Sequence, residues 1–183
     1  VDGTGAPPFL GSVRVSGERI AEVGECAGTA KIEIDADGLV LAPGIIDSHT
    51  HFDAQITWDP MATPSPGHGV TTVLIGNCGF TIAPCRPENR DKTMRNLVRV
   101  EGMSLKAMEA GIDWEFESFS DYLELLEAKG VGPNVGTFVG HSSIRTHVLG
   151  DDASLRSATE DEVEAMRCLV DEAMAAGAVG FST

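Results

Sequence analysis

The chain has 183 residues, of which 42% are hydrophobic and 22% are charged, an ordinary balance for a globular protein. Its 28 acidic and 13 basic residues give a formal net charge of −15 at pH 7. This charge argues against nucleic acid or an anionic membrane surface as a partner, because both are bound through a basic face.

Cysteine usage predicts the redox environment. The four cysteines include no Cys-x-x-Cys pair, and their spacing shows no disulfide framework. We therefore expect free thiols in a reducing compartment, which predicts a cytoplasmic protein. No uninterrupted apolar stretch approaches the roughly 20 residues of a membrane-spanning helix.

Residues 1–41 predict a small β subdomain. Val13 and Val15 alternate with polar residues, and Ile32 and Ile34 repeat that pattern before the turn DADG and the apolar run 39–41. We expect short antiparallel strands that are exposed on one face.

Residues 42–183 follow a different rhythm, in which apolar strands alternate with helical stretches. Capping boxes at Ser118 and Thr159 predict two helix starts, and the region 87–110 predicts a helix with a break near Gly102. The strands are apolar on both faces, which is typical of a parallel sheet. The pattern fits half of an eight-stranded barrel or a small open α/β sheet. The four expected strands are 45–50, 69–77, 134–141 and 177–183.

The first of these strands carries an unusual group of side chains in the run DSHTHFD. Alternation along the strand places Asp47, His49, His51 and Asp53 on one face. Such a cluster is costly to bury unless something accepts it, and a metal ion is the simplest acceptor.

Two later strands also end in residues whose side chains can bind a metal ion. Cys78 directly follows the second strand, and His141 ends the third. The carboxyl ends of parallel strands meet at one rim, so these side chains are expected near His49 and His51. Two imidazoles and a thiolate suit zinc.

Each of these assignments has a structural alternative. Cys78 could be a small buried apolar residue, although its place in an Asn-Cys-Gly turn favours an exposed sulfur. His141 could contact substrate or be a hydrogen-bonded histidine at a strand end. Asp53 is a candidate for contacting substrate or for supporting a ligand. Cys85 is interpreted as structural.

The segments APGIIDSHTHFDAQ and GVTTVLIGNCGF together resemble the metal-dependent amidohydrolase superfamily, and within it the D-aminoacylase (N-acyl-D-amino-acid deacylase) branch. VGHSSIR and GAVGFST extend the resemblance. It implies a (β/α)8 barrel (TIM type) with a small β-sandwich, to which residues 1–41 would contribute. It also implies that His49 and His51 ligate one zinc position, and that Cys78 ligates zinc and can bridge two ions.

The resemblance further implies that part of the site lies outside these residues. No residue here matches the family's general base, which is expected beyond Thr183 together with the remaining metal ligands. The chain therefore looks like an N-terminal fragment that is inactive alone, with about four β/α units of the barrel.

The leading hypothesis is a zinc-dependent hydrolase that cleaves non-peptide C–N bonds in small molecules, most specifically N-acyl-D-amino acids, with water activated by one or two Zn²⁺ ions. One alternative is a cyclic-amide hydrolase, similar to a hydantoinase, with the same metal ligands. Another is a non-catalytic fragment that serves only for interaction or folding. The D-amino acid preference rests on the resemblance alone.

Overall fold

A computed structural model describes residues 1–183. The chain divides into two compact units, residues 1–44 and 45–183. None of its helices combines the length and the apolar character that crossing a membrane requires.

The first unit contains one antiparallel hairpin of β1 (Ser12–Ser16) and β2 (Arg19–Gly24). The further strands expected around residues 32–34 and 39–41 do not form, and their apolar side chains are exposed. An alternating pattern makes a strand only where a partner strand completes its hydrogen bonds, and these segments have none within the unit.

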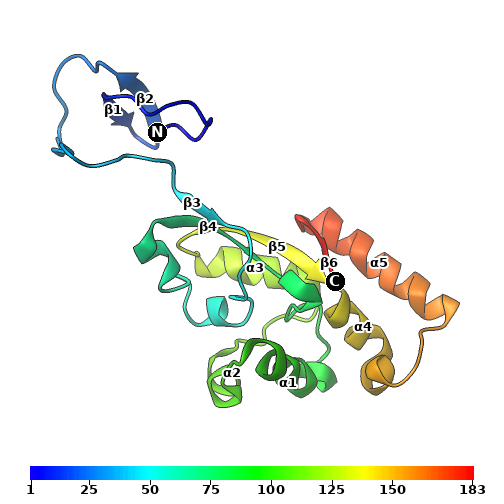
Figure 1. Ribbon diagram of the computed structural model, residues 1–183. Helices are drawn as coiled ribbons and strands as arrows, with labels where there is room; N and C mark the ends of the chain where they lie inside the picture. Colours follow the sequence, from blue (N-terminus) through cyan, green and yellow to red (C-terminus); the bar gives the residue numbers. More distant parts are fainter. The chain divides into compact units, whose positions relative to one another are not determined.

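The second unit is built on a four-stranded parallel sheet in the order β3-β4-β5-β6 (Figure 1). Its strands follow one another in space as they do along the chain. This confirms the predicted succession of parallel strands separated by helical connections. The strands are β3 (Ile45–Asp47), β4 (Val70–Ile75), β5 (Asn134–Gly140) and β6 (Gly180–Ser182).

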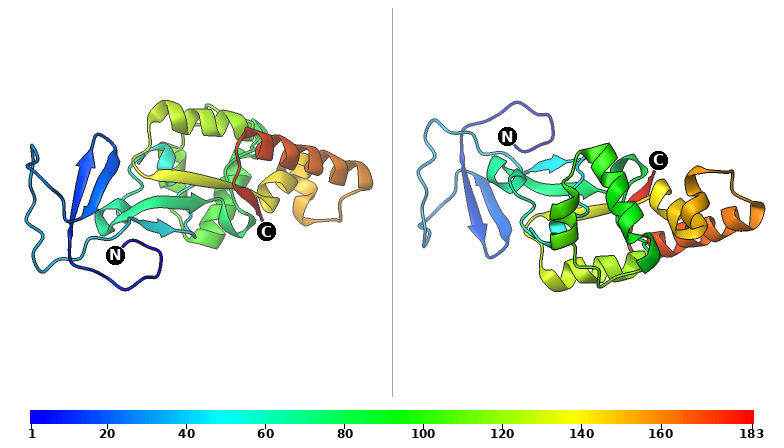
Figure 2. Two further views of the ribbon diagram at one scale, coloured as in Figure 1. Left: turned by 90° about the horizontal axis from the view of Figure 1, so that it is seen from above. Right: turned by 90° about the horizontal axis from the view of Figure 1, so that it is seen from below.

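The views in Figures 1 and 2 place α1 and α2 on one side of this sheet. The buried core forms between the strands and the helices, and includes Val73 and Ile75 of β4, Val139 of β5, Leu97 of α1 and Tyr122 of α3. The α-helices are α1 (Arg90–Glu101), α2 (Leu105–Gly111), α3 (Phe119–Lys129), α4 (His141–Leu149) and α5 (Glu160–Ala176).

Short 3₁₀ helices make up much of the remaining connections. They are η1 (Gln55–Thr57), η2 (Ser65–His68), η3 (Asn77–Gly79), η4 (Pro87–Asn89) and η5 (Gly150–Ser154). Of these, η3 directly follows β4 and contains Cys78, so it positions the candidate sulfur ligand.

Local sequence signals fix the helix boundaries as predicted. Gly102 ends α1 in the left-handed conformation (φ 66°), so the break expected there separates α1 from α2. Ser118 starts α3 with a capping box.

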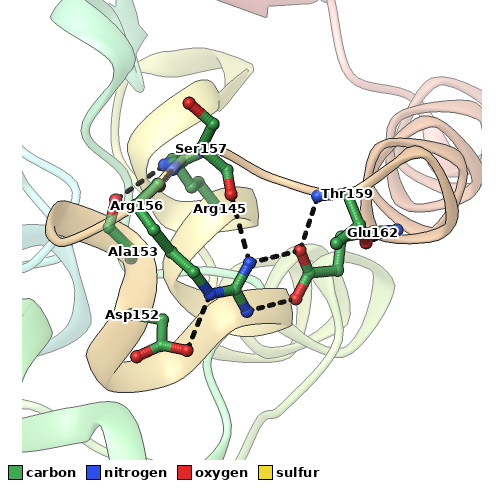
Figure 3. Close-up of polar contacts among 7 residues, drawn as sticks. All are labelled: Arg145, Asp152, Ala153, Arg156, Ser157, Thr159 and Glu162. Carbon is green, nitrogen blue, oxygen red and sulfur yellow. Dashed lines mark hydrogen bonds and ion pairs between the residues drawn. The ribbon is translucent and has the colours of Figure 1, made fainter.

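The start of α5 is also a capping box, formed by Thr159 and Glu162. The guanidinium of Arg156 contacts both oxygens of Glu162, at 2.8 and 2.6 Å, and Asp152 at 2.9 Å (Figure 3). The connection between η5 and α5 is therefore tied to the first turn of the helix.

Candidate metal centre

Three side chains form a potential metal site at the carboxyl ends of β3 and β4. The potential ligand atoms of His49, His51 and Cys78 all lie within 4.8 Å of one another. The Sγ of Cys78 is 3.2 Å from Nε2 of His49, and the two imidazole rings meet edge to face with centroids 5.4 Å apart. The structure thus brings together the three residues that the sequence singled out for zinc.

The cluster fits a zinc ion. Zinc prefers tetrahedral sites of nitrogen and sulfur ligands, and two such ligands about 2.0–2.3 Å from one ion are separated by less than 5 Å. His49 and Cys78 are exposed and His51 is half-buried, so an ion can reach them from solvent. The same ion would hold the thiol of Cys78 as a thiolate.

The backbone after β4 turns sharply to present the sulfur. Gly76 and Gly79 have φ values of 80° and 76°, and Cys78 itself has φ 55°. At Gly76 a Cβ would lie 2.3 Å from the carbonyl oxygen of Phe138, so only glycine fits there. A left-handed conformation is unfavourable for cysteine, which means that surrounding contacts must hold the turn.

Asn77 supplies part of that support. Its side-chain Nδ2 donates to the carbonyl oxygens of Thr50 (3.1 Å) and Leu74 (3.0 Å). The Thr50 backbone N–H also donates to the Leu74 oxygen, at 3.0 Å. These bonds join the segment that carries the two histidines to the turn that carries the cysteine.

Glu101 is a site residue that the sequence did not reveal. Its Oε1 lies 3.4 Å from Nε2 of His51, and the two side chains are 18% and 17% exposed. Carboxylates commonly accept the second ring N–H of a metal-binding histidine and so fix its orientation. Burial lowers the pKa of His51, while the charge of Glu101 opposes that shift. The only sequence signal was an acidic residue at the end of a helix, where the macrodipole disfavours it.

Asp53 is buried and is not part of the three-residue cluster of ligand atoms. Strand β3 ends at Asp47, so the alternation expected to place four side chains on one face is wrong beyond that residue. Asp53 is 1% exposed, so its carboxyl group is almost entirely removed from solvent. Burial raises its pKa to about 7. The hydroxyl of Tyr122 donates to its backbone oxygen at 2.9 Å.

His141 is the first residue of α4 and lies outside the three-residue cluster. It is exposed, its ring is 6.1 Å from that of Phe181, and it borders an open groove of about 840 Å³ between α4 and α5. Cys85 is buried and its Sγ lies 3.4 Å from Oγ1 of Thr93, away from the cluster.

Known proteins are similar to this chain in both sequence and architecture. The chain is 40% identical over 184 residues to the D-aminoacylase of Alcaligenes xylosoxydans xylosoxydans, covering 100% of this chain and 35% of that protein. A solved D-aminoacylase structure, from work on the role of its binuclear metal centre, has a TM-score of 0.83 at 43% identity and covers 100% of this chain and 36% of its own.

A second solved structure is the N-acyl-D-glutamate deacylase of Bordetella bronchiseptica, complexed with zinc and a phosphonate inhibitor. It has a TM-score of 0.79 at 34% identity and covers 100% of this chain and 36% of its own. The sheet of the second unit therefore corresponds to part of a curled parallel half-barrel. The chain spans about a third of the length of these relatives.

The amidohydrolase family model matches residues 33–183, which include the whole second unit and the metal cluster. The chain therefore belongs to the amidohydrolase family.

Proposed function

We propose that His49, His51 and Cys78 bind zinc in a hydrolase that cleaves N-acyl-D-amino acids. The observation that carries this proposal is the convergence of three nitrogen and sulfur ligand atoms within 4.8 Å. Similarity to a D-aminoacylase and to an N-acyl-D-glutamate deacylase supports the proposed substrate class.

When bound, zinc lowers the pKa of water towards neutrality and polarises an amide carbonyl. The residues of this chain prepare the site for that chemistry. His49 and His51 bind as neutral imidazoles, and the carboxylate of Glu101, 3.4 Å from the ring of His51, keeps that ring in one orientation. Cys78 binds as a thiolate from a backbone turn that is already in place.

We assign the two remaining candidates to different roles. Asp53 is only 1% exposed, so its proposed role is to support the segment that carries the ligands and not to touch substrate. His141 is exposed after β5, at the same end of the sheet as Cys78, and is proposed to contact substrate. The general base and further metal ligands are proposed to come from other parts of a complete (β/α)8 barrel.

The test is zinc analysis of the complete gene product after dialysis, together with hydrolysis of paired N-acyl-D- and N-acyl-L-amino acids. We expect bound zinc and cleavage of the D-substrates only. Cys78→Ala should remove tightly held zinc, whereas Cys168→Ala, which changes an exposed cysteine of α5, should leave it in place. Unchanged zinc content in Cys78→Ala would refute the ligand assignment.

A further inference from the structure

Ser182 lies at the end of β6, more than one hundred residues after the Cys78 turn, yet its hydroxyl bridges that turn. The backbone N–H of Gly79 donates to Oγ of Ser182 at 3.1 Å. The same hydroxyl donates to the carbonyl oxygen of Gly76. One side chain thus satisfies a donor and an acceptor on opposite flanks of Cys78.

The turn has little support from its own sequence on this side. No side chain caps η3, and its backbone is closed by a hydrogen bond from the N–H of Phe80 to the oxygen of Asn77. Asn77 holds the turn towards β3 and β4 through Thr50. The Ser182 hydroxyl holds it on the opposite side, from β6.

Sheet packing fixes the position of the hydroxyl. Ser182 pairs with Gly140 in the parallel register of β5 and β6. At Gly140 a Cβ would lie 2.5 Å from the carbonyl oxygen of Gly79, so β5 and the turn are in close contact. The end of β6 is thereby set at a fixed distance from the cysteine turn.

We infer that Ser182 is a positioning residue for the metal site, which holds the Cys78 turn in the left-handed conformation that presents its sulfur. This inference rests on the proposed function, because it assumes that Cys78 is a metal ligand. Without the hydroxyl, the Gly79 N–H and the Gly76 carbonyl lose their partner. Cys78, with φ 55°, can then relax towards a conformation that withdraws the thiolate.

The experiment compares two pairs of variants in the complete gene product: Ser182→Ala with its control Ser154→Ala, and Ser182→Thr with Ser182→Val. Ser182→Ala removes the hydroxyl from the native side chain. Ser182→Thr keeps a hydroxyl and Ser182→Val removes it at nearly the same volume, and both residues are suited to a strand. Ser154→Ala is the matched control, since Ser154 is exposed in η5. Zinc affinity is measured by chelator competition, and cobalt substitution reports the thiolate through its charge-transfer band.

We expect Ser182→Ala and Ser182→Val to weaken zinc binding about 10–100-fold and to diminish the cobalt–thiolate band. Ser182→Thr and Ser154→Ala should retain both. If Ser182→Ala does not fold, as judged by circular dichroism, the Thr and Val pair decides the question.

Two results would overturn the inference, and they are distinguishable. If the variants without the hydroxyl keep the wild-type cobalt–thiolate band and zinc affinity, Ser182 does not position the metal site. The proposed function would be unaffected by that result. A wild-type protein that binds cobalt without any thiolate band would refute Cys78 as a ligand, and the role of Ser182 with it.

Discussion

At the level of single residues, the candidate metal centre gathers acidic groups around two imidazoles. Glu101 contacts His51, Cys78 would add a thiolate, and Asp53, two residues after His51, is buried. Burial raises the pKa of Asp53 to about 7, and the charge of Glu101 contributes to that shift. A cation relieves this crowding of negative charge, which is a physical reason for a metal at this position.

Glu101→Gln tests whether the carboxylate orients His51. Glutamine is a weaker acceptor, so we expect the affinity for zinc to fall about tenfold or more. The measurement is chelator competition in the complete gene product. Glu109→Gln, an exposed change on α2, is the control and should keep the wild-type affinity. Equal affinities in all three proteins would show that Glu101 does not act on the metal site.

Alanine substitutions at Gly76 and at Gly102 measure how much the cysteine turn depends on close backbone contact. Gly76 lies in the turn, and Gly102 is the comparison outside it. Both have positive φ, but a Cβ at Gly76 would collide with the oxygen of Phe138, whereas nothing lies within 4 Å at Gly102. Gly102→Ala should lower the free energy of unfolding by about 1–2 kcal/mol. Gly76→Ala should lower it by roughly 2–5 kcal/mol, because overpacking adds to the backbone cost.

Urea unfolding of the metal-free proteins measures these two losses directly. A loss at Gly76 no larger than that at Gly102 would contradict the tight packing of the turn against β5.

At the level of elements, the sequence correctly predicted the features that depend on local residues. The helix break at Gly102 and the capping boxes at Ser118 and Thr159 depend on neighbouring residues, and all three are present. The two histidines and the cysteine were found because strand ends meet at one edge of a parallel sheet. Glu101 and Ser182 were missed because only tertiary packing brings α1 and β6 to those strand ends.

The errors at this scale have the same origin. The strand expected over residues 45–50 stops at Asp47, and the later apolar runs of the first unit form no strands. Alternation along one segment shows which residues suit a strand. It does not show where pairing with a neighbour ends.

The first turn of α5 predicts a pH dependence of stability. The hydrogen bond from Arg156 lowers the pKa of Glu162 to about 2, from an ordinary value of 4.5. A lowered carboxylate pKa stabilises the folded state above the ordinary value, and that contribution is lost as the pH falls towards 2.

Glu162→Gln removes this contribution, so the wild-type protein should melt at a higher temperature than the variant above pH 4.5, and the difference should shrink at lower pH. Thermal unfolding of both proteins across this range is the measurement. Glu160→Gln, in the same turn but without the arginine contact, is the control. A difference that does not change with pH would show that the ion pair contributes nothing to stability.

At the level of the whole molecule, the sheet has two edges, β3 and β6, without a strand partner in the second unit. Apolar side chains accompany these edges, including Ile45 and Ile46 of β3 and Phe181 of β6, which are 55%, 65% and 45% exposed. Open edges beside apolar surface favour pairing with another chain.

We therefore expect the 183-residue chain, expressed alone, to self-associate at micromolar concentration. Light scattering coupled to size-exclusion chromatography measures this. A monomer that unfolds cooperatively would contradict the prediction and would show that this portion of the fold is stable without further strands.

The most direct test of the central claim is zinc-edge X-ray absorption of the zinc-loaded complete gene product. If His49, His51 and Cys78 bind the ion, the spectrum contains a sulfur shell at about 2.3 Å and nitrogen at about 2.0–2.1 Å, and Cys78→Ala loses the sulfur. A wild-type spectrum with nitrogen and oxygen ligands only would contradict the proposed metal centre.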